Sequence, residues 1–489
     1  MSSPQLQQDT AADIEAGLAS PPSLRQRPTN VNSLRPTPTQ LHAALSRSAV
    51  TAGFGTKKVK QGTRAKPAFK IPLIPSIKAT VFMSYVNVML VFIPLGFASH
   101  YAHWGDVPTF IINFLAIIPL AKLLGFATEE LALSLGEALG GLLNATFGNA
   151  VELIMAIIAL SEGEITIVQT SLLGSILSNI LLVAGFSFLL GGLFNVNKKR
   201  NFGIQTFDKT EAQTSAALMV LAILSMMVPS AIHTIRPTGD AAKIKEETDT
   251  LNKDVRNMSR GVSLVLIVVY VLFIYFQIFA SKPGEPTGHN VEAEGHEEEE
   301  EEEPSINFYF AIALLVIATA LTALCAEYLI GSLNGLSTAW NLNKKFVGLI
   351  LLPLVGNAAE HLTAITCAIK DKMGIVIGVA IGSSIQIALF VTPLSVIIGW
   401  AMGKPMTLDF GYPETIIMLI SVLVLNFIIL DGESHWLEGT MLLAAYVIIG
   451  ISFVFYPIFD ETENGGSTDK KPAAALAQAA VAALSGGRL

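Results

Sequence analysis

Two short stretches of this chain place an acid and an amide inside otherwise apolar sequence. GNAVELIMAI occupies 148–157 and GNAAEHLTAI occupies 356–365. In each, an asparagine precedes a glutamate by three residues, so on a helix Asn149 shares a face with Glu152, and Asn357 with Glu360. An ionised carboxylate in apolar surroundings is costly unless a charge partner or a proton compensates it. If the two acids face each other, they are stable either protonated or around a cation.

The four side chains of these motifs predict a binding site for a hard metal ion. Glu152, Glu360, Asn149 and Asn357 offer oxygen ligands, which suit Ca²⁺, Mg²⁺ or Mn²⁺ rather than softer metals. Ca²⁺ takes 6–8 oxygens in loose geometry, which leaves room for backbone carbonyls and water. The adjacent glycines, Gly148 and Gly356, would let the backbone come close to the ion.

Further polar side chains follow each motif. GSILSN contains Ser175, Ser178 and Asn179, and GSSIQI contains Ser383 and Gln386. They are candidates to line an ion pathway or to orient the carboxylates. Helix packing is the alternative role for the serines, because small residues are common at contacts between membrane helices. The larger amides favour a polar lining, since they are costly to bury unpaired.

His361 directly follows Glu360 and points about 100° away from it on a helix. It either tunes the neighbouring proton equilibrium or packs against another helix. The first motif has Leu153 at the equivalent position, so His361 is not part of the repeated core.

The composition predicts that a lipid bilayer surrounds these elements. The 489 residues are 52% hydrophobic and only 14% charged, whereas a soluble domain is about 25% charged. The charge pattern gives no indication of nucleic-acid binding, and the two cysteines, Cys325 and Cys367, lie in apolar segments and predict neither a disulfide framework nor a zinc site. Eleven apolar segments are long enough to span a bilayer: 78–100, 107–126, 135–160, 165–194, 211–232, 260–280, 306–334, 344–369, 374–402, 413–430 and 436–457.

The chain also contains an internal duplication. A shift of 208 residues superimposes the two motifs, and the same shift places Gly174 and Ser175 on Gly382 and Ser383. Agreement at two separated motifs in one register indicates a repeat. Each copy holds five spans, an odd number, so the second copy enters the membrane from the opposite face. Such an inverted repeat brings the two glutamates together near the midplane.

The predicted fold class is therefore an all-α polytopic membrane protein with about 11 transmembrane helices arranged as 1 + 5 + 5. Its predicted segments are a disordered basic cytosolic tail (1–70), an extra first helix (71–104), the first five-helix repeat (105–284), an acidic cytosolic linker (285–304), the second repeat (305–458) and a flexible C-terminal tail (459–489). Basic residues beside the first span predict a cytosolic N-terminus, and the odd span count then predicts a lumenal C-terminus.

The linker carries seven consecutive acids. They are either a solvated connection between the halves or a regulatory segment that concentrates cations or docks on basic loops. These residues are Glu297, Glu298, Glu299, Glu300, Glu301, Glu302 and Glu303.

Both motifs, GNAVELI…GSILSN and GNAAEHL…GSSIQIALFVTP, resemble the α-repeats of the cation/proton exchangers, within the cation/calcium exchanger superfamily. The resemblance covers about 80–457, and the acidic linker and extra first span are most similar to the fungal vacuolar calcium/proton exchangers. It implies that Glu152 and Glu360 bind Ca²⁺ and carry counter-transported protons, with no cofactor. It also implies a vacuolar membrane and the use of a proton gradient, with Mn²⁺ as a further candidate substrate.

Three other functions compete with this interpretation. The first is a sodium/calcium exchanger or cation channel, although the G-T-S-x-P-E pattern typical of sodium/calcium exchangers is replaced here by G-N-A-x-E. The second is an intramembrane enzyme, which is disfavoured because AEHLTA lacks the second histidine of HExxH. The third is a membrane scaffold that transports nothing.

Overall fold

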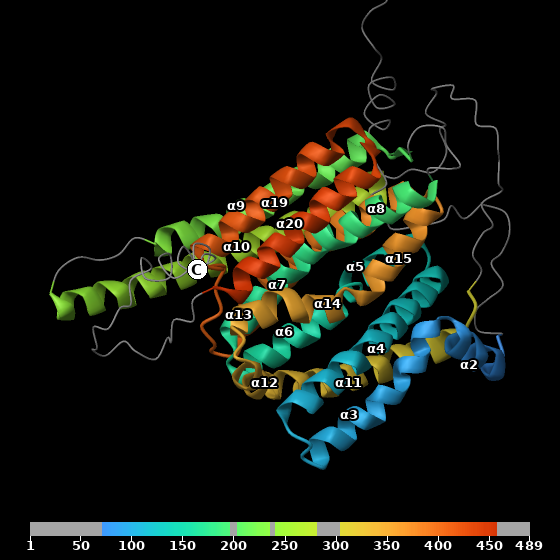
Figure 1. The fold of residues 1–489 in the computed structure, drawn as a ribbon, viewed down its shortest axis with the longest axis horizontal. Helices are drawn as coiled ribbons and strands as arrows, with labels where there is room; N and C mark the ends of the chain where they lie inside the picture. Colours follow the sequence, from blue (N-terminus) through green and yellow to red (C-terminus); the bar gives the residue numbers. More distant parts are fainter. Residues whose placement is uncertain (1–70, 196–202, 235–239, 281–303, 457–489) are drawn as a thin grey trace, which may run out of the picture. The chain divides into compact units, whose positions relative to one another are not determined.

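The computed structural model describes residues 71–195, 203–234, 240–280 and 304–456, and these residues form a helical bundle (Figure 1). The first part of the chain forms the following elements: α2 (Leu73–Phe82), η3 (Tyr85–Val91), α3 (Phe92–Tyr101), α4 (Asp106–Leu135), α5 (Glu137–Phe147), α6 (Ala150–Glu162), α7 (Ile165–Leu177), η4 (Ser178–Val183), α8 (Ala184–Asn195), β1 (Gln205–Thr206), α9 (Lys209–His233) and α10 (Ala241–Ala280).

The second part begins with α11 (Phe308–Gly331) and continues with α12 (Leu333–Trp340), α13 (Lys344–Phe346), η5 (Val347–Leu351), α14 (Leu352–Gly356), α15 (Ala358–Ile369), α16 (Met373–Ile377), η6 (Gly378–Gly382), α17 (Ser383–Gln386), η7 (Ile387–Val391), α18 (Thr392–Ala401), α19 (Tyr412–Ile428), η8 (Ile429–Asp431), β2 (Glu433–Ser434) and α20 (Trp436–Val454). The short strands β1 and β2 pair antiparallel, Gln205 opposite Ser434.

Eight of the described helices are long and apolar enough to cross a membrane, and two bent helix pairs raise the number to ten. The bent pairs are 73–82 with 85–101 and 344–356 with 358–369. The predicted count of eleven is therefore not confirmed. The missing span is 135–160, which the structure divides into α5 and α6. Its glycines and asparagines lower its apolar character, and they also break the helix at Gly148 and Asn149.

The duplication is visible in the backbone. Helices α5 and α6 are separated at Asn149, and α14 and α15 are separated at Asn357, 208 residues later. The π-helix η4 (178–183) likewise matches η7 (387–391) in the second copy. Short π-helical segments within α-helices are frequent at functional sites. Both copies thus interrupt their helices beside the polar motifs.

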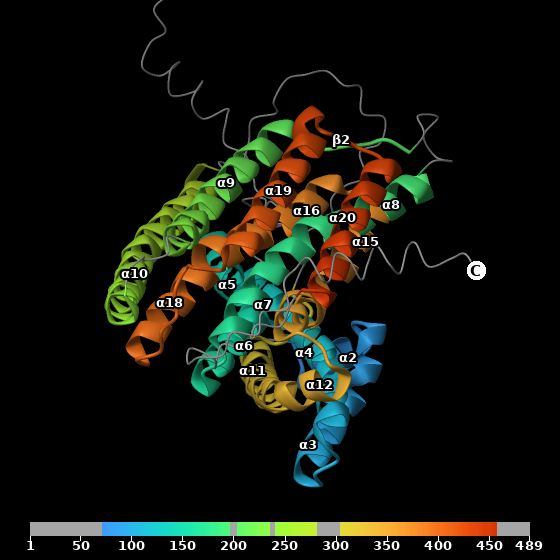
Figure 2. The ribbon, with the colours of Figure 1, turned by 60° about the vertical axis from the view of Figure 1, so that its left-hand side comes forward.

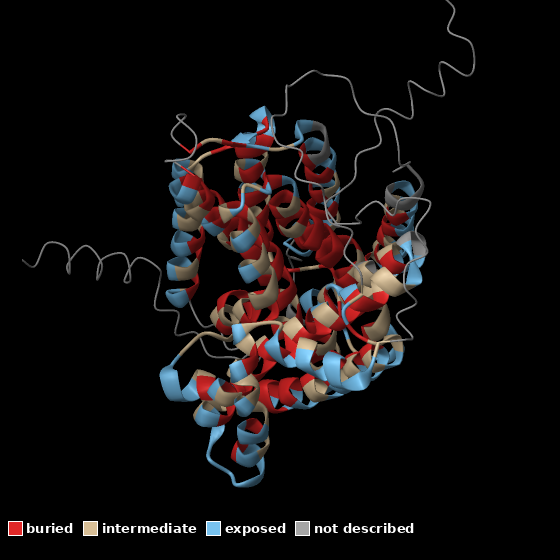
Figure 3. Ribbon diagram, turned by 90° about the vertical axis from the view of Figure 1, so that its right-hand side faces the viewer, coloured by how far each residue is buried: buried red, intermediate tan, exposed pale blue. Residues whose placement is uncertain are grey.

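Two composite helices form the centre of the bundle. In the apolar windows of 165–195 and 373–401, 78% and 72% of the residues are buried, against 22% in the windows of α10 and α20. Figure 3 shows the same contrast between buried inner and exposed outer helices. Outer pairs such as α4 with α11 and α9 with α19 lie side by side (Figure 2). The polar side chains that follow each motif, Ser175, Ser178, Asn179, Ser383 and Gln386, therefore lie inside the protein.

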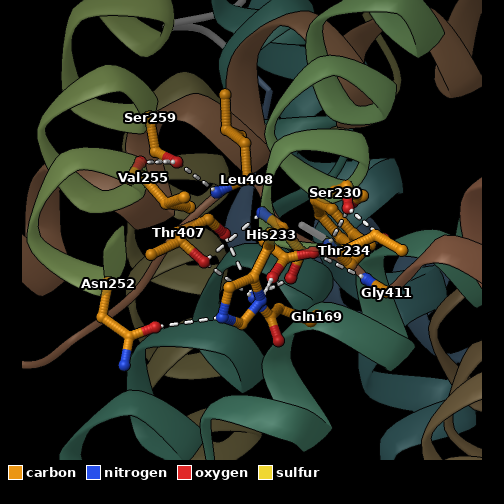
Figure 4. A network of polar contacts seen from close by, with 12 residues as sticks. Gln169, Ser230, His233, Thr234, Asn252, Val255, Ser259, Thr407, Leu408 and Gly411 are labelled. Carbon is orange, nitrogen blue, oxygen red and sulfur yellow. Dashed lines mark hydrogen bonds and ion pairs between the residues drawn. The ribbon is translucent and has the colours of Figure 1, made fainter. Parts of the chain in front are cut away.

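Residues 241–260 lie between two predicted spans, 211–232 and 260–280. They form the first half of α10, a continuous 40-residue helix. The connection 402–411 packs against this extension (Figure 4). Ser259 Oγ accepts the main-chain N–H of Leu408 at 3.0 Å, and His233 Nδ1 lies 2.5 Å from Asp409 Oδ2. Polar residues of 241–260 thus serve tertiary contacts rather than a free loop.

Candidate cation-binding site

The two motif glutamates lie at the beginnings of two half-helices. Glu152 is in the first turn of α6 and Glu360 is in the first turn of α15, each three residues after the asparagine that breaks its helix. The positive end of the helix dipole favours a carboxylate at this position. The break therefore does two things: it exposes backbone groups near the site, and it supplies an environment that tolerates negative charge inside the bundle.

The carboxyl group of the first copy reaches the motif of the second. A Cβ atom built on Gly356, in the second copy, would lie 2.8 Å from Glu152 Oε1, so the first-copy acid lies against the backbone of the second motif. Glu152 is only 4% exposed, and the charge of Glu360 acts on it. Glu360 as a whole is half-buried, but its Oε2 atom is fully buried. The binding of one ion by both carboxylates stays a prediction.

Several buried oxygens around this pair have no hydrogen-bond partner within the described part of the chain. They are Glu152 Oε1, Glu360 Oε2, Asn357 Oδ1 and Asn179 Oδ1. Buried polar atoms are normally satisfied, so a group of unsatisfied oxygens indicates a place for protons, water or an ion. Two of these oxygens can carry negative charge, which suits a hard divalent cation. The buried nitrogens Gln386 Nε2 and His361 Nε2 also lack a partner among the described residues.

A chain of side-chain hydrogen bonds connects the two copies beside the acids. Asn179 Nδ2 donates to Ser383 Oγ at 3.1 Å, and Ser383 Oγ donates to Asn149 Oδ1 at 2.9 Å. Asn149 Nδ2 in turn donates to Gln386 Oε1 at 2.5 Å. Members from the first and second copies alternate along this chain. These hydrogen bonds hold Asn149, and with it the break between α5 and α6, against α17.

Asn357 has a different environment from Asn149. Its Nδ2 donates to the main-chain oxygen of Ser175 at 3.1 Å, which leaves its Oδ1 unpartnered among the described residues. Ser175 therefore contributes its carbonyl rather than its hydroxyl in this contact. Ser178 is buried at the start of η4, which packs against α20, and its Oγ has no hydrogen-bond partner among the described residues.

The remaining predicted residues lie at the margin of the site. Gly148 allows close packing, because a Cβ there would lie 2.6 Å from Asn144 O and 3.4 Å from Gln386 Oε1. His361 Nδ1 lies 2.6 Å from the carbonyl of Asn357 and must donate to it, since a carbonyl only accepts. The same ring lines an open groove of about 360 Å³ with Val86, Leu354, Ala358, Leu362 and Ile365. The seven acids Glu297–Glu303 lie outside the described residues.

Sequence reasoning missed one charged neighbour, Lys122 of α4. Its Nζ donates to Thr363 Oγ1 at 3.4 Å, and its charge acts on Glu360. The signal was present, because PLAKLLGF places a lone lysine within an apolar span. The two glutamates are predictable from the sequence because they recur in a repeated motif, whereas Lys122 does not belong to a repeated motif.

Comparison with known proteins identifies the family of this chain. Residues 106–279 and 310–455 match the family described as sodium/calcium exchanger protein. The chain is 45% identical over 382 residues to a vacuolar calcium ion transporter of Schizosaccharomyces pombe, covering 78% of this chain and 87% of that protein. It is 42% identical over 391 residues to a Ca²⁺/H⁺ antiporter of Aphanothece halophytica, covering 78% and 99%.

Among solved structures, native YfkE matches with a TM-score of 0.61 and 35% identity, over 76% of this chain and 99% of YfkE. A second structure of YfkE describes it as a Ca²⁺/H⁺ antiporter protein. The family match covers more than half of the chain, and the relatives exceed 40% identity over most of their own length. The chain therefore belongs to the sodium/calcium exchanger protein family and, within it, to the cation/proton exchangers that its two motifs resemble.

Proposed function

We propose that this protein is a secondary-active calcium/proton antiporter, which moves cytosolic Ca²⁺ into an acidic compartment in exchange for H⁺. The observation that carries the proposal is the approach of Glu152, from the first copy, to Gly356 in the second motif, together with buried oxygens of Glu152, Glu360 and Asn357 that lack partners among the described residues. The names of the relatives, vacuolar calcium ion transporter and Ca²⁺/H⁺ antiporter, support the same pair of ions.

The proposed mechanism has two states of one site. With Ca²⁺ bound, both glutamates are ionised, and amide and backbone oxygens complete the coordination. Protons that arrive from the acidic side neutralise the carboxylates and release the ion, and two protons per Ca²⁺ balance the charge of the site. Alternating access follows from the two copies, which rock around the fixed site. Asn149 and Asn357, at the two helix breaks, lie where such a movement would change the coordination.

The proposed location is the vacuolar membrane, with multiple spans, a cytosolic N-terminus and a lumenal C-terminus. The vacuolar relatives and the eight to ten candidate spans support a multi-pass protein of that membrane. The cytosolic N-terminus rests on the basic residues beside the first span. The lumenal C-terminus rests on an odd number of spans, in which α5 and α6 together form the eleventh.

The test is Ca²⁺ uptake into proteoliposomes under an imposed pH gradient, with and without Na⁺. Wild-type protein should take up Ca²⁺ when the lumen is acidic and should not require Na⁺. Glu152→Gln and Glu360→Gln should each abolish uptake, because a neutral amide cannot alternate between a proton and a metal ion. Glu327→Gln is the matched control, since Glu327 lies on α11 and is exposed.

The alternative is a sodium/calcium exchanger of the same fold, which the name of the matching family keeps open. Uptake that depends on a Na⁺ gradient and ignores ΔpH would favour it. Unchanged flux in both glutamine variants would contradict the two-glutamate site under either function.

A further inference from the structure

Lys122 is a cation in an unusual place. It lies near the middle of α4, a 30-residue helix that is apolar enough to span the membrane. A lysine at the centre of a bilayer is costly and normally faces the protein interior, where it pairs with another group. Lys122 is half-buried, so its ammonium requires an explanation from the neighbouring elements.

The elements beside Lys122 are those that carry the second motif. Helix α4 packs against both α14 and α15. Lys122 Nζ donates to Thr363 Oγ1 at 3.4 Å, and Thr363 follows Glu360 by three residues on the same face of α15. The lysine charge acts on Glu360, one turn before Thr363, and on Cys367, one turn after it. The ammonium therefore lies against the face of α15 that carries Glu360.

The helix that packs beside the first glutamate carries no such cation. Helix α11 packs against α6, the helix of Glu152, as α4 packs against α15. No lysine or arginine occurs between Phe308 and Gly331. Of these two helices, only α4 thus carries a cation.

We propose that Lys122 is a resident counter-charge for Glu360, which competes with the transported cation and so limits how tightly the site holds it. This inference rests on the proposed function. When Ca²⁺ occupies the site, Lys122 and the ion repel each other. When the ion leaves, the ammonium compensates the Glu360 carboxylate. A transporter needs binding that is strong enough to load and weak enough to release, and a nearby fixed positive charge adjusts that balance.

The test compares Lys122→Met, which keeps the length of the side chain without its charge, with Lys122→Arg, which keeps the charge. Uptake of Ca²⁺ into proteoliposomes under a pH gradient gives KM and maximal rate, and titration of the purified protein with Ca²⁺ at neutral pH gives Kd. Lys122→Met should lower KM and Kd on the order of five- to tenfold and should slow the maximal rate, because release becomes harder. Lys122→Arg should stay within about twofold of wild type in all three.

A purely structural role gives a different result. Both variants would then lose maximal rate or thermal stability together, while KM and Kd stay at the wild-type values, and this outcome would overturn the proposal. If Lys122→Met does not fold, Lys122→Gln removes the same charge with a polar side chain and must show the same decrease in Kd. The Kd comparison holds even if wild-type uptake proves independent of ΔpH, so failure of the proposed function is distinguishable from failure of this inference.

Discussion

At the scale of single residues, the two asparagines of the repeated motif are not equivalent. Asn149 Oδ1 accepts from Ser383 and its Nδ2 donates to Gln386, whereas Asn357 Oδ1 has no partner among the described residues. An oxygen that already accepts a hydrogen bond is less available to a cation. Asn149 is therefore placed to hold the copies together, and Asn357 is placed to be a ligand.

This difference predicts opposite phenotypes for two matched variants. Asn357→Ala should raise the KM for Ca²⁺ several-fold with little change in Tm, because it removes a candidate ligand. Asn149→Ala should lower stability by about 1–3 kcal/mol, because it leaves buried Ser383 and Gln386 without their partner. KM from uptake assays and Tm from detergent-solubilised protein separate the two. An equal rise of KM in both variants, with Tm unchanged, would contradict the assignment.

At the scale of elements, α7 passes unusually close to the broken helix of the second copy. A Cβ on Gly174 would clash with the main-chain oxygen of Leu349 in η5, and main chain cannot move aside as a flexible side chain can. Gly174→Ala should therefore separate the two site-bearing elements and cost about 1–3 kcal/mol or more. Gly374→Ala is the control, since nothing lies within 4 Å of a Cβ there. Size-exclusion profiles recorded during heating should show a lower midpoint for Gly174→Ala alone.

The second broken helix is also anchored at its beginning, by two neighbouring lysines with different surroundings. Lys345 Nζ lies 2.6 Å from Glu414 Oε1, and Glu414 is only 1% exposed, whereas Lys344 and Glu164 pair at 3.1 Å where Lys344 is 41% exposed. Removing one partner of a buried pair costs about 3–5 kcal/mol, and an exposed pair contributes about 0–1 kcal/mol.

Lys345→Met should accordingly lower Tm much more than Lys344→Met. The double variant Lys345→Met/Glu414→Gln should recover part of the loss, because it no longer buries a charge without a partner. Equal Tm values for the two single variants would show that the buried pair does not stabilise this end of the helix.

At the scale of the whole molecule, the repeat was readable from sequence because identical residue types recur in one register. The shift of 208 residues predicted that Glu152 and Glu360 would meet, and the helix breaks at Asn149 and Asn357 lie at equivalent places. Features without periodicity or repetition were not readable. The contact of Lys122 with Thr363 joins residues 241 positions apart, and the hydrogen bond between Ser259 and Leu408 joins residues 149 positions apart. Both depend on tertiary neighbours that a single sequence does not identify.

The whole molecule should also report occupancy of the site through its stability. A ligand that binds only the folded protein raises Tm in proportion to the logarithm of its concentration above Kd. Ca²⁺ requires ionised carboxylates, so protons compete with it, and metal affinity rises with pH. The shift in Tm caused by Ca²⁺ should therefore be large at pH 8, shrink as the pH falls, and disappear in acid.

Thermal unfolding of the purified protein, with and without Ca²⁺ between pH 5 and 8, measures this dependence. The variant Glu152→Gln/Glu360→Gln should show no Ca²⁺-dependent shift at any pH, while Glu327→Gln should follow wild type. Na⁺ at matched ionic strength should leave Tm unchanged if the site prefers a divalent ion. A Ca²⁺ shift that grows as the pH falls, or that survives in the double variant, would place the Ca²⁺-binding groups elsewhere in the molecule.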